Sequence, residues 1–148
     1  MAEASPALDA AVDDLQRSYD KQQVITSLLQ LSLEDNPLDE LLKRALDLLH
    51  TIAWLALESK GGIFLAEDQR EVLVLKAQKG LAAPIQAACR RVPFGRCLCG
   101  LAASTRKIQF ADGPDERHVI HYKGITSHGH YCVPILSGNR LLLSLIHI

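Results

Sequence analysis

Apolar residues recur at helical spacing through the first part of the chain, with Asp, Gln, Arg and Lys between them. They are Leu8, Val12, Leu15, Tyr19, Ile25, Leu28 and Leu31 or Leu33. Because the stretch contains no glycine or proline, the pattern predicts one long amphipathic helix over about 8–33. The apolar seam suits pairing with a second copy of the chain. Its imperfect heptads suit packing against the chain's own domain equally well.

A second helix is predicted from the stretch "EDNPLDELL" to about Thr51. Asn36 suits the N-cap, and Pro37 suits the first helical position. Asp39 and Glu40 suit the positive end of the helix dipole. Leucines at helical spacing then supply a broad stripe that is expected to face a core.

Shorter elements are predicted along the rest of the chain. "GGIFLA" (61–66) and "EVLVLKAQ" (71–78) are typical of two strands around the polar turn "EDQR". The remaining predicted elements are helices at 82–91 and 97–105 and strands at 107–111 and 130–136. This order predicts an α+β domain with a central antiparallel sheet and flanking helices.

Composition and charge narrow the class of protein. The chain has 148 residues, of which 48% are hydrophobic, and this is enough for one domain with a single core. The net charge of −1 argues against general binding to nucleic acid or to an anionic membrane. Residues 1–50 carry ten acidic and four basic residues, whereas residues 51–148 carry seven acidic and twelve basic ones. The basic residues of the second part either form a solvated surface or attract an anionic ligand; they include Arg90, Arg91, Arg96, Arg106 and Lys107.

The sequence contains no apolar run that approaches the roughly 20 residues needed to span a bilayer. Its first residues, "MAEASPALDAAVDD", are acidic and polar, unlike a secretory signal. We therefore predict a cytoplasmic location, where the four cysteines are expected to be reduced thiols, metal ligands or redox centres.

The last six residues, "LSLIHI", can be encoded by CTG TCT CTT ATA CAC ATC. That DNA resembles the end of the transposon adapters used to fragment DNA for sequencing. We interpret residues 143–148 as an adapter artefact and expect the natural chain to continue after about residue 142, which makes this sequence a fragment. The alternative is a real C-terminal strand, because the six residues are apolar enough to pair as one.

The stretches "ALESKGGIFLAED", "VPFGRCLCGLAA", "FADGPDERHVIHY" and "HGHYCVPILSGNRLL" together resemble the GAF domain, a small-molecule-sensing module of bacterial signalling proteins. The resemblance covers about residues 22–142. It implies a central antiparallel sheet with helices on one side and a ligand pocket on the other, roofed by residues 80–125. We divide the chain into a tail and signalling helix (1–35), a GAF-like sensor domain truncated before its last strand (36–142) and the adapter residues (143–148).

The resemblance also implies partners. It is to a GAF subgroup found next to histidine kinase, diguanylate cyclase or response-regulator modules. The leading helix is expected to join two copies into a homodimer and to relay the ligand state to an output domain outside this sequence. The domain itself is expected to be non-catalytic.

Most of the cysteines and histidines fall within residues 97–132, namely Cys97, Cys99, His118, His121, His128, His130 and Cys132. Thiolate and imidazole are good ligands for zinc, iron or copper, so a metal ion or a haem is the candidate cofactor. The candidate metal ligands are Cys97, Cys99, His128, His130 and Cys132. The candidate residues for a small-molecule ligand also include Asp112, Glu116, Arg117 and His118.

The thiols allow two further interpretations. Cys97 or Cys99 is placed to form a disulfide with Cys132 across the pocket, and a helix start near Arg96 is expected to lower the thiol pKa values. The stretch "FGRCLCG" is similar to "FGxGxCG" of the free methionine-R-sulfoxide reductases and matches it at Cys99. The other cysteines of those enzymes have no counterpart in 112–131. The plain alternative is packing, because free cysteine is among the most buried residue types.

The stretch "DERH" (115–118) allows two interpretations. Asp115 and Glu116 either cap a short helix, leaving Arg117 and His118 to face a ligand, or belong to a solvated polar loop. The sequence has no "NKFDE"-like motif of cyclic-nucleotide-binding GAF domains and no phosphate-binding loop. We therefore predict a sensor of a small molecule, of redox state or of a metal. The alternatives are a thiol-dependent methionine sulfoxide reductase and a dimerisation module that binds no ligand.

Overall fold

The structure is a computed structural model, and it describes residues 6–55, 58–121, 123–124 and 128–147. The chain divides into two compact units, residues 1–56 and 57–148. The second predicted helix, which the sequence analysis grouped with the sensor domain, lies in the first unit.

The first unit consists of two helices and a short 3-10 turn. Helix α1 spans Pro6–Ser32, α2 spans Leu38–Leu49 and η1 spans Ala53–Leu55. Both predicted helices are confirmed, but the predicted cap of the second is wrong. Pro37 occupies the N-cap position, and the Asn36 side-chain amide donates a hydrogen bond to the Glu34 carboxylate at 2.8 Å instead. Arg44 of α2 also donates to Glu34, with Nη2 2.9 Å from Oε1, so this carboxylate ties the turn to α2.

The apolar seam of α1 splits into two parts. The four residues of its first half, Leu8, Val12, Leu15 and Tyr19, are 59%, 57%, 72% and 58% exposed. Leu31 in the second half is buried and lines a groove with Arg44 and Leu48 of α2. The seam therefore packs within the first unit only near its C-terminal end.

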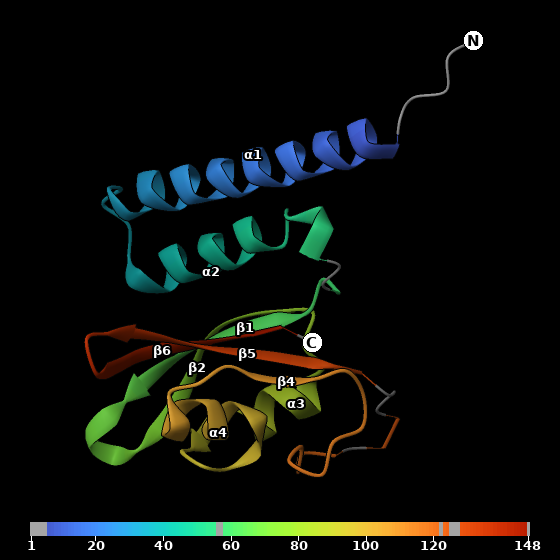
Figure 1. The fold of residues 1–148 in the computed structure, drawn as a ribbon. Coiled ribbons are helices and arrows are strands. Elements are labelled where there is room, and N and C mark those ends of the chain that lie inside the picture. The colour runs from blue at the N-terminus through green and yellow to red at the C-terminus, as the bar shows by residue number, and fades with distance from the viewer. Residues whose placement is uncertain (1–5, 56–57, 122, 125–127, 148) are drawn as a thin grey trace. The chain divides into compact units, whose positions relative to one another are not determined.

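The second unit is built on a six-stranded antiparallel sheet (Figure 1). Its strands are β1 (Gly61–Glu67), β2 (Val72–Lys79), β3 (Arg91–Pro93), β4 (Gln109–Ala111), β5 (His130–Ser137) and β6 (Arg140–His147). They lie in the order β3-β2-β1-β6-β5-β4, and η2 (Asp68–Arg70) connects β1 to β2. The predicted α+β class with an antiparallel sheet and a long N-terminal helix is confirmed.

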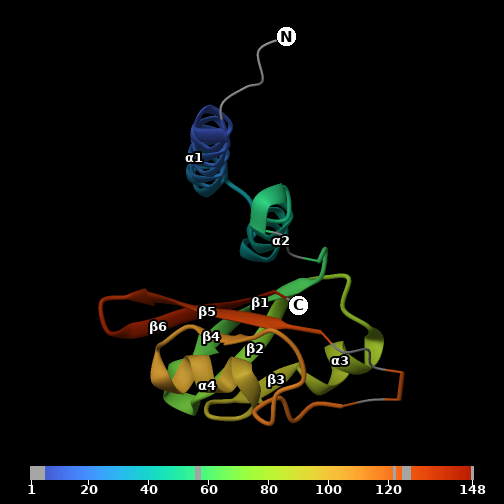
Figure 2. The same ribbon diagram turned by 45° about the vertical axis from the view of Figure 1, so that its right-hand side comes forward.

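Two helices, α3 (Ala83–Ala88) and α4 (Cys97–Thr105), lie on the same face of this sheet (Figures 1 and 2). The prediction of one helix over 82–91 is wrong at its C-terminal end. The helix stops at Ala88, and Arg91–Pro93 pairs with β2 as an edge strand. Three residues are too few to show the two-residue periodicity of a strand, so β3 has no periodic signal in the sequence.

Strand β6 lies between β1 and β5 in the middle of the sheet. Residues 143–147, which were interpreted from the sequence as adapter, form the last five of its eight residues. Leu143 is the register partner of Leu65 in β1 and of Ile135 in β5. In this chain these residues complete the sheet, whatever DNA encodes them.

The core of the second unit lies between the sheet and helices α3 and α4. Leu73, Leu98 and Cys132 in it are completely buried. Helix α4, "CLCGLAAST", carries small residues that allow close approach to its neighbours. Gly100 makes the closest approach, because a Cβ built there would lie 2.3 Å from the Pro93 carbonyl oxygen.

Helix α4 ends at Arg106, which adopts the left-handed conformation with φ 54°. Glycine adopts this conformation without steric cost, whereas other L-residues are strained in it. We expect Arg106→Gly to raise the free energy of unfolding by about 0.5–1 kcal/mol, measured by urea denaturation. Arg106→Ala removes the same charged side chain but keeps Cβ, so it should give no gain. An equal gain from both variants would contradict the explanation.

Candidate functional site

A small cavity lies between the sheet and the segments that cover it. Phe64 of β1 and His130 of β5 line its sheet side. Ile85 of α3, Cys99 of α4 and His118 line it from the covering side. The other lining residues are Gly62, Leu81, Cys89, Cys97, Ile120 and Ile146. Its volume of about 20 Å³ is room for about one water molecule.

All four cysteines are free and buried. A hydrogen bond to Cys99, followed by burial, raises the pKa of the Cys97 thiol. A hydrogen bond with Cys132, together with burial, raises the pKa of the Cys99 thiol well above its usual range. The expectation of lowered pKa values at the helix start is therefore wrong, because hydrogen bonds between the thiols and burial raise both pKa values. These groups are neutral thiols at physiological pH.

Three histidines meet beside the cavity. The ring centroids of His118 and His130 lie 4.2 Å apart, those of His128 and His130 4.7 Å, and those of His118 and His128 5.4 Å. One ring nitrogen from each histidine lies within 4.8 Å of one from each of the other two. His121 lies next to this cluster, with its ring centroid 5.6 Å from that of His118, but it is exposed.

His130 is the most deeply buried of the three, with 5% of its surface exposed. Neither of its ring nitrogens has a hydrogen-bond partner among the described residues. Burial, followed by repulsion from His118 and His128, lowers the pKa of His130 to about 3. Burial also lowers the pKa of His118. The imidazole of His130 is therefore neutral at physiological pH.

The polar residues predicted from "DERH" do not form a short helix. Asp115 accepts hydrogen bonds from the Arg117 backbone N–H and Nε, both at 2.8 Å, in a turn. Arg117 also donates to the Phe110 carbonyl at 2.9 Å, so it anchors this segment to β4 and does not face the cavity. Its hydrogen bonds hold the pKa of Asp115 at about 2. Asp112 and Glu116 are exposed. Asp115 and Glu116 therefore belong to a polar loop, as the second interpretation of this stretch predicted. Of the four DERH residues, His118 alone lines the cavity.

A model of the family described as "GAF domain" matches residues 35–146. The chain belongs to the GAF family. The match includes α2, the strands β1 to β5 and all of β6 but its last residue.

Solved structures share the fold at low sequence identity. The GAF domain of A. Aeolicus nlh2 superposes with a TM-score of 0.70 at 14% identity, covering 88% of this chain and 80% of that one. The GAF domain of a phosphoenolpyruvate-protein phosphotransferase from Coxiella burnetii gives 0.69 at 24%, covering 87% and 77%. The free methionine-R-sulfoxide reductase from Neisseria meningitidis gives 0.68 at 19%, covering 99% and 77%. These likenesses establish the fold alone.

A search of curated proteins found no significant match to this GAF domain. Among its described residues, no helix is both long and apolar enough to cross a membrane.

The five basic residues considered for an anionic ligand are not among the described residues that line the cavity. Arg91 pairs with Glu67, with Nη2 2.9 Å from Oε2.

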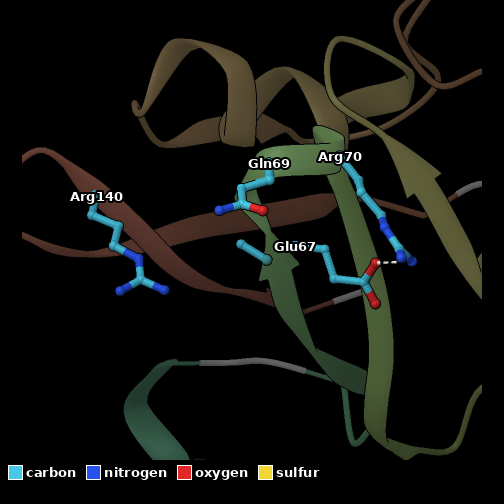
Figure 3. Close-up of a pocket in the computed structure, with 5 residues that line it drawn as sticks. Glu67, Gln69, Arg70 and Arg140 are labelled. Carbon is cyan, nitrogen blue, oxygen red and sulfur yellow. Dashed lines mark hydrogen bonds and ion pairs between the residues drawn. The ribbon is translucent and has the colours of Figure 1, made fainter.

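A separate open pocket lies at the end of β1, where Figure 3 shows Glu67 and Arg70 pointing toward each other and Arg140 of β6 on the far side of Gln69. The Glu67 carboxylate forms ion pairs with both Arg70 and Arg91. Arg140 lines the other side of this pocket.

The structure brings six of the nine predicted site residues of this GAF domain into one region: Cys97, Cys99, His118, His128, His130 and Cys132. Asp112, Glu116 and Arg117 lie outside it. Sequence reasoning missed the apolar half of the lining, which includes Phe64, Ile85 and Ile120. Those residues come from three separate segments, and in the sequence each is marked only by being apolar.

Proposed function

We propose that this GAF domain is a cytoplasmic sensor of a bacterial signalling protein, and that the cavity walled by thiols and imidazoles receives its ligand or redox signal. The observation that carries the proposal is the burial of both His130 ring nitrogens without a hydrogen-bond partner among the described residues. An imidazole whose two nitrogens are buried without hydrogen-bond partners costs about 1–3 kcal/mol per unsatisfied group. A bound ligand that supplies a partner removes that cost.

The size of the cavity limits what it takes in the conformation described. At about 20 Å³ it admits a ligand no larger than water. A larger organic ligand requires α3 or residues 112–121 to move outward, and such movement is a means of linking occupancy to a change of shape.

The test is a thermal-shift screen of the tag-free chain against small organic and inorganic ligands, and against the thiol oxidant diamide. We expect at least one condition to raise or lower the melting temperature of the wild type but not that of His130→Phe or Cys99→Val. Each variant places an apolar side chain of similar size in the cavity wall and removes the imidazole or the thiol. If no condition distinguishes the wild type from these variants, the sensor function is wrong.

We propose further that α1 joins two copies of the chain and relays the signal to an output module such as a histidine kinase or diguanylate cyclase. Leu8, Val12, Leu15 and Tyr19 recur at intervals of four, three and four residues, which is the spacing of a coiled-coil seam. All four side chains are more than half exposed. A second copy offers the same stripe and would cover it.

Leu15→Lys should therefore shift the chain from dimer to monomer in sedimentation-velocity experiments over a range of concentrations, because a lysine in the seam places a charge in the interface. Ala10→Lys introduces the same charge on the opposite face of α1 and should leave the dimer intact. A monomeric wild type, or equal effects of the two variants, would exclude this role for α1.

A second candidate is a thiol-dependent reductase of free methionine sulfoxide. The fold likeness to the Neisseria enzyme and the position of Cys99 support it. The raised pKa values of Cys97 and Cys99 oppose it, because the thiolate is the nucleophile in such chemistry. Turnover of free methionine-R-sulfoxide with dithiothreitol, abolished in Cys99→Ser, would establish the enzyme. Absence of turnover would remove it.

A further inference from the structure

We propose that His118, His128 and His130 bind a divalent transition-metal ion of the Zn²⁺ class through their three imidazoles, with a fourth coordination position open toward the cavity. The inference rests on the proposed sensor function because it assigns a ligand class to the same site.

The first support is the geometry of the cluster. The three candidate ligand atoms lie within 4.8 Å of one another. Imidazole nitrogens bind Zn²⁺ at about 2.0–2.1 Å, so ligands of one ion lie about 3.3 Å apart in a tetrahedral site. Small rotations of the rings close that difference. His130 begins β5 and His128 lies two residues before it, with their ring centroids 4.7 Å apart. The His118 ring, from the covering segment, lies 4.2 Å from His130 and 5.4 Å from His128.

The second support is the state of His130. Only 5% of its surface is exposed, and both ring nitrogens lack a hydrogen-bond partner among the described residues. A metal ion binds one of these nitrogens and so satisfies a group that nothing else described satisfies.

The donor set selects the kind of ion. Neutral imidazoles suit Zn²⁺, Cu²⁺, Ni²⁺ and Fe²⁺, whereas Mg²⁺ and Ca²⁺ prefer oxygen ligands. The nearby carboxylate of Asp115 is held by Arg117 and is not in the cluster. The thiols of Cys97, Cys99 and Cys132 are free and hydrogen-bond to one another. The cluster therefore differs from the ligand set expected from the sequence, because it gains His118 and contains no cysteine.

Three protein ligands leave a fourth position of a tetrahedral ion for water or an exogenous molecule. His118 and His130 both line the cavity, which has room for about one water molecule. A ligand of that size, either water or a small molecule that displaces it, would therefore complete the coordination. Exchange at this position gives the site a way to respond to a second small ligand.

The experiment measures binding of Zn²⁺ to the full chain, without a histidine tag and under reducing conditions, by competition with a chromogenic chelator. Co²⁺ is then used as a spectroscopic probe. We expect one ion per chain and a visible d–d absorption of tetrahedral Co²⁺ without a thiolate charge-transfer band in the near ultraviolet. A charge-transfer band that is lost in Cys99→Ser would show a cysteine-containing site and overturn the inference.

The variants His118→Ala and His128→Ala remove ligands that are only half-buried, so the fold should tolerate them. Each should weaken Zn²⁺ binding by more than the roughly 10- to 100-fold that loss of an outer-shell partner costs. The matched control is His121→Ala, which removes an exposed imidazole beside the cluster and should leave the affinity unchanged. Absence of binding, or equal weakening by His121→Ala, would overturn the inference.

The two proposals fail in different ways. If Zn²⁺ does not bind but an organic ligand or diamide shifts the melting temperature only when His130 and Cys99 are intact, the metal site is wrong and the sensor function stands. If Zn²⁺ binds but neither Zn²⁺ nor any other condition of the screen shifts the melting temperature of the wild type differently from that of the variants, the metal site stands and the sensor function is wrong. If neither is observed, both are wrong.

Discussion

Replacing Gly100 with alanine should lower the free energy of unfolding by about 2–3 kcal/mol. The added Cβ would lie 2.3 Å from the Pro93 carbonyl oxygen and 3.2 Å from the Gly95 nitrogen. Both are backbone atoms that cannot rotate away, so α4 must shift from the turn that precedes it. The shift would also strain the hydrogen bond from the Gly95 N–H to the Gly100 carbonyl, which is 2.7 Å long. These costs outweigh the roughly 1 kcal/mol that alanine gains over glycine inside a helix.

Urea denaturation of the wild type and the Gly100→Ala variant measures this effect. Gly113→Ala is the matched control, because a Cβ there meets nothing within 4 Å. The control should unfold close to the wild type. A Gly100→Ala variant as stable as the wild type would show that α4 can move freely against the sheet, and the closed cavity would then not be a fixed property of the fold.

Acidification from pH 7 to pH 5 should remove about 2 kcal/mol of stability through His130 alone. The unfolded chain binds a proton at this residue below about pH 6.5, whereas burial holds the folded pKa at about 3. Because the unfolded state gains the proton first, stability due to this residue is complete above pH 6.5 and is lost progressively as the pH falls toward 3. The charged and titratable groups that act on it are His118 and His128, which lower its pKa, and Asp115, which raises it.

The measurement is urea denaturation at both pH values, with EDTA present so that a bound metal does not contribute. We compare the wild type with His130→Gln and attribute to His130 the difference in their pH dependence. Other groups titrate in both proteins and cancel. His121→Gln controls for loss of an exposed imidazole and should keep the wild-type pH dependence. If His130→Gln loses as much stability as the wild type on acidification, His130 is not buried as a neutral group.

The sequence predicted the elements that are long and periodic and failed at those set by tertiary contact. The helices of the first unit and the strands β1, β2 and β5 follow from periodicity, whereas β3 exists because three residues pair with β2. The same distinction holds in the site. His128 and His130 are two residues apart in the sequence, but His118 joins them only because the covering segment folds back onto β5.

The direction of the thiol pKa shifts is a second feature that could not be predicted from the sequence. A helix start near Arg96 argues for lowered values, and a sequence contains no measure of burial to set against that argument. In the folded protein Cys97 and Cys99 are 5% and 6% exposed and lie against other thiols, so the pKa values rise. Arg117 fails as a ligand contact for a different reason, since its side chain is exposed and its hydrogen bonds go to the nearby Asp115 carboxylate and the Phe110 carbonyl.

The central position of β6 has a consequence for biosynthesis. β1 is made early in the second unit and β6 last, yet the two are neighbours, with Gly61 opposite His147. Such pairing raises the contact order of the fold and slows its completion. While the ribosome makes the segments between them, β1 pairs with β2 on one side and presents an open apolar edge on the other. During that interval a nascent chain with this strand order is most prone to aggregate through the unpaired edge of β1.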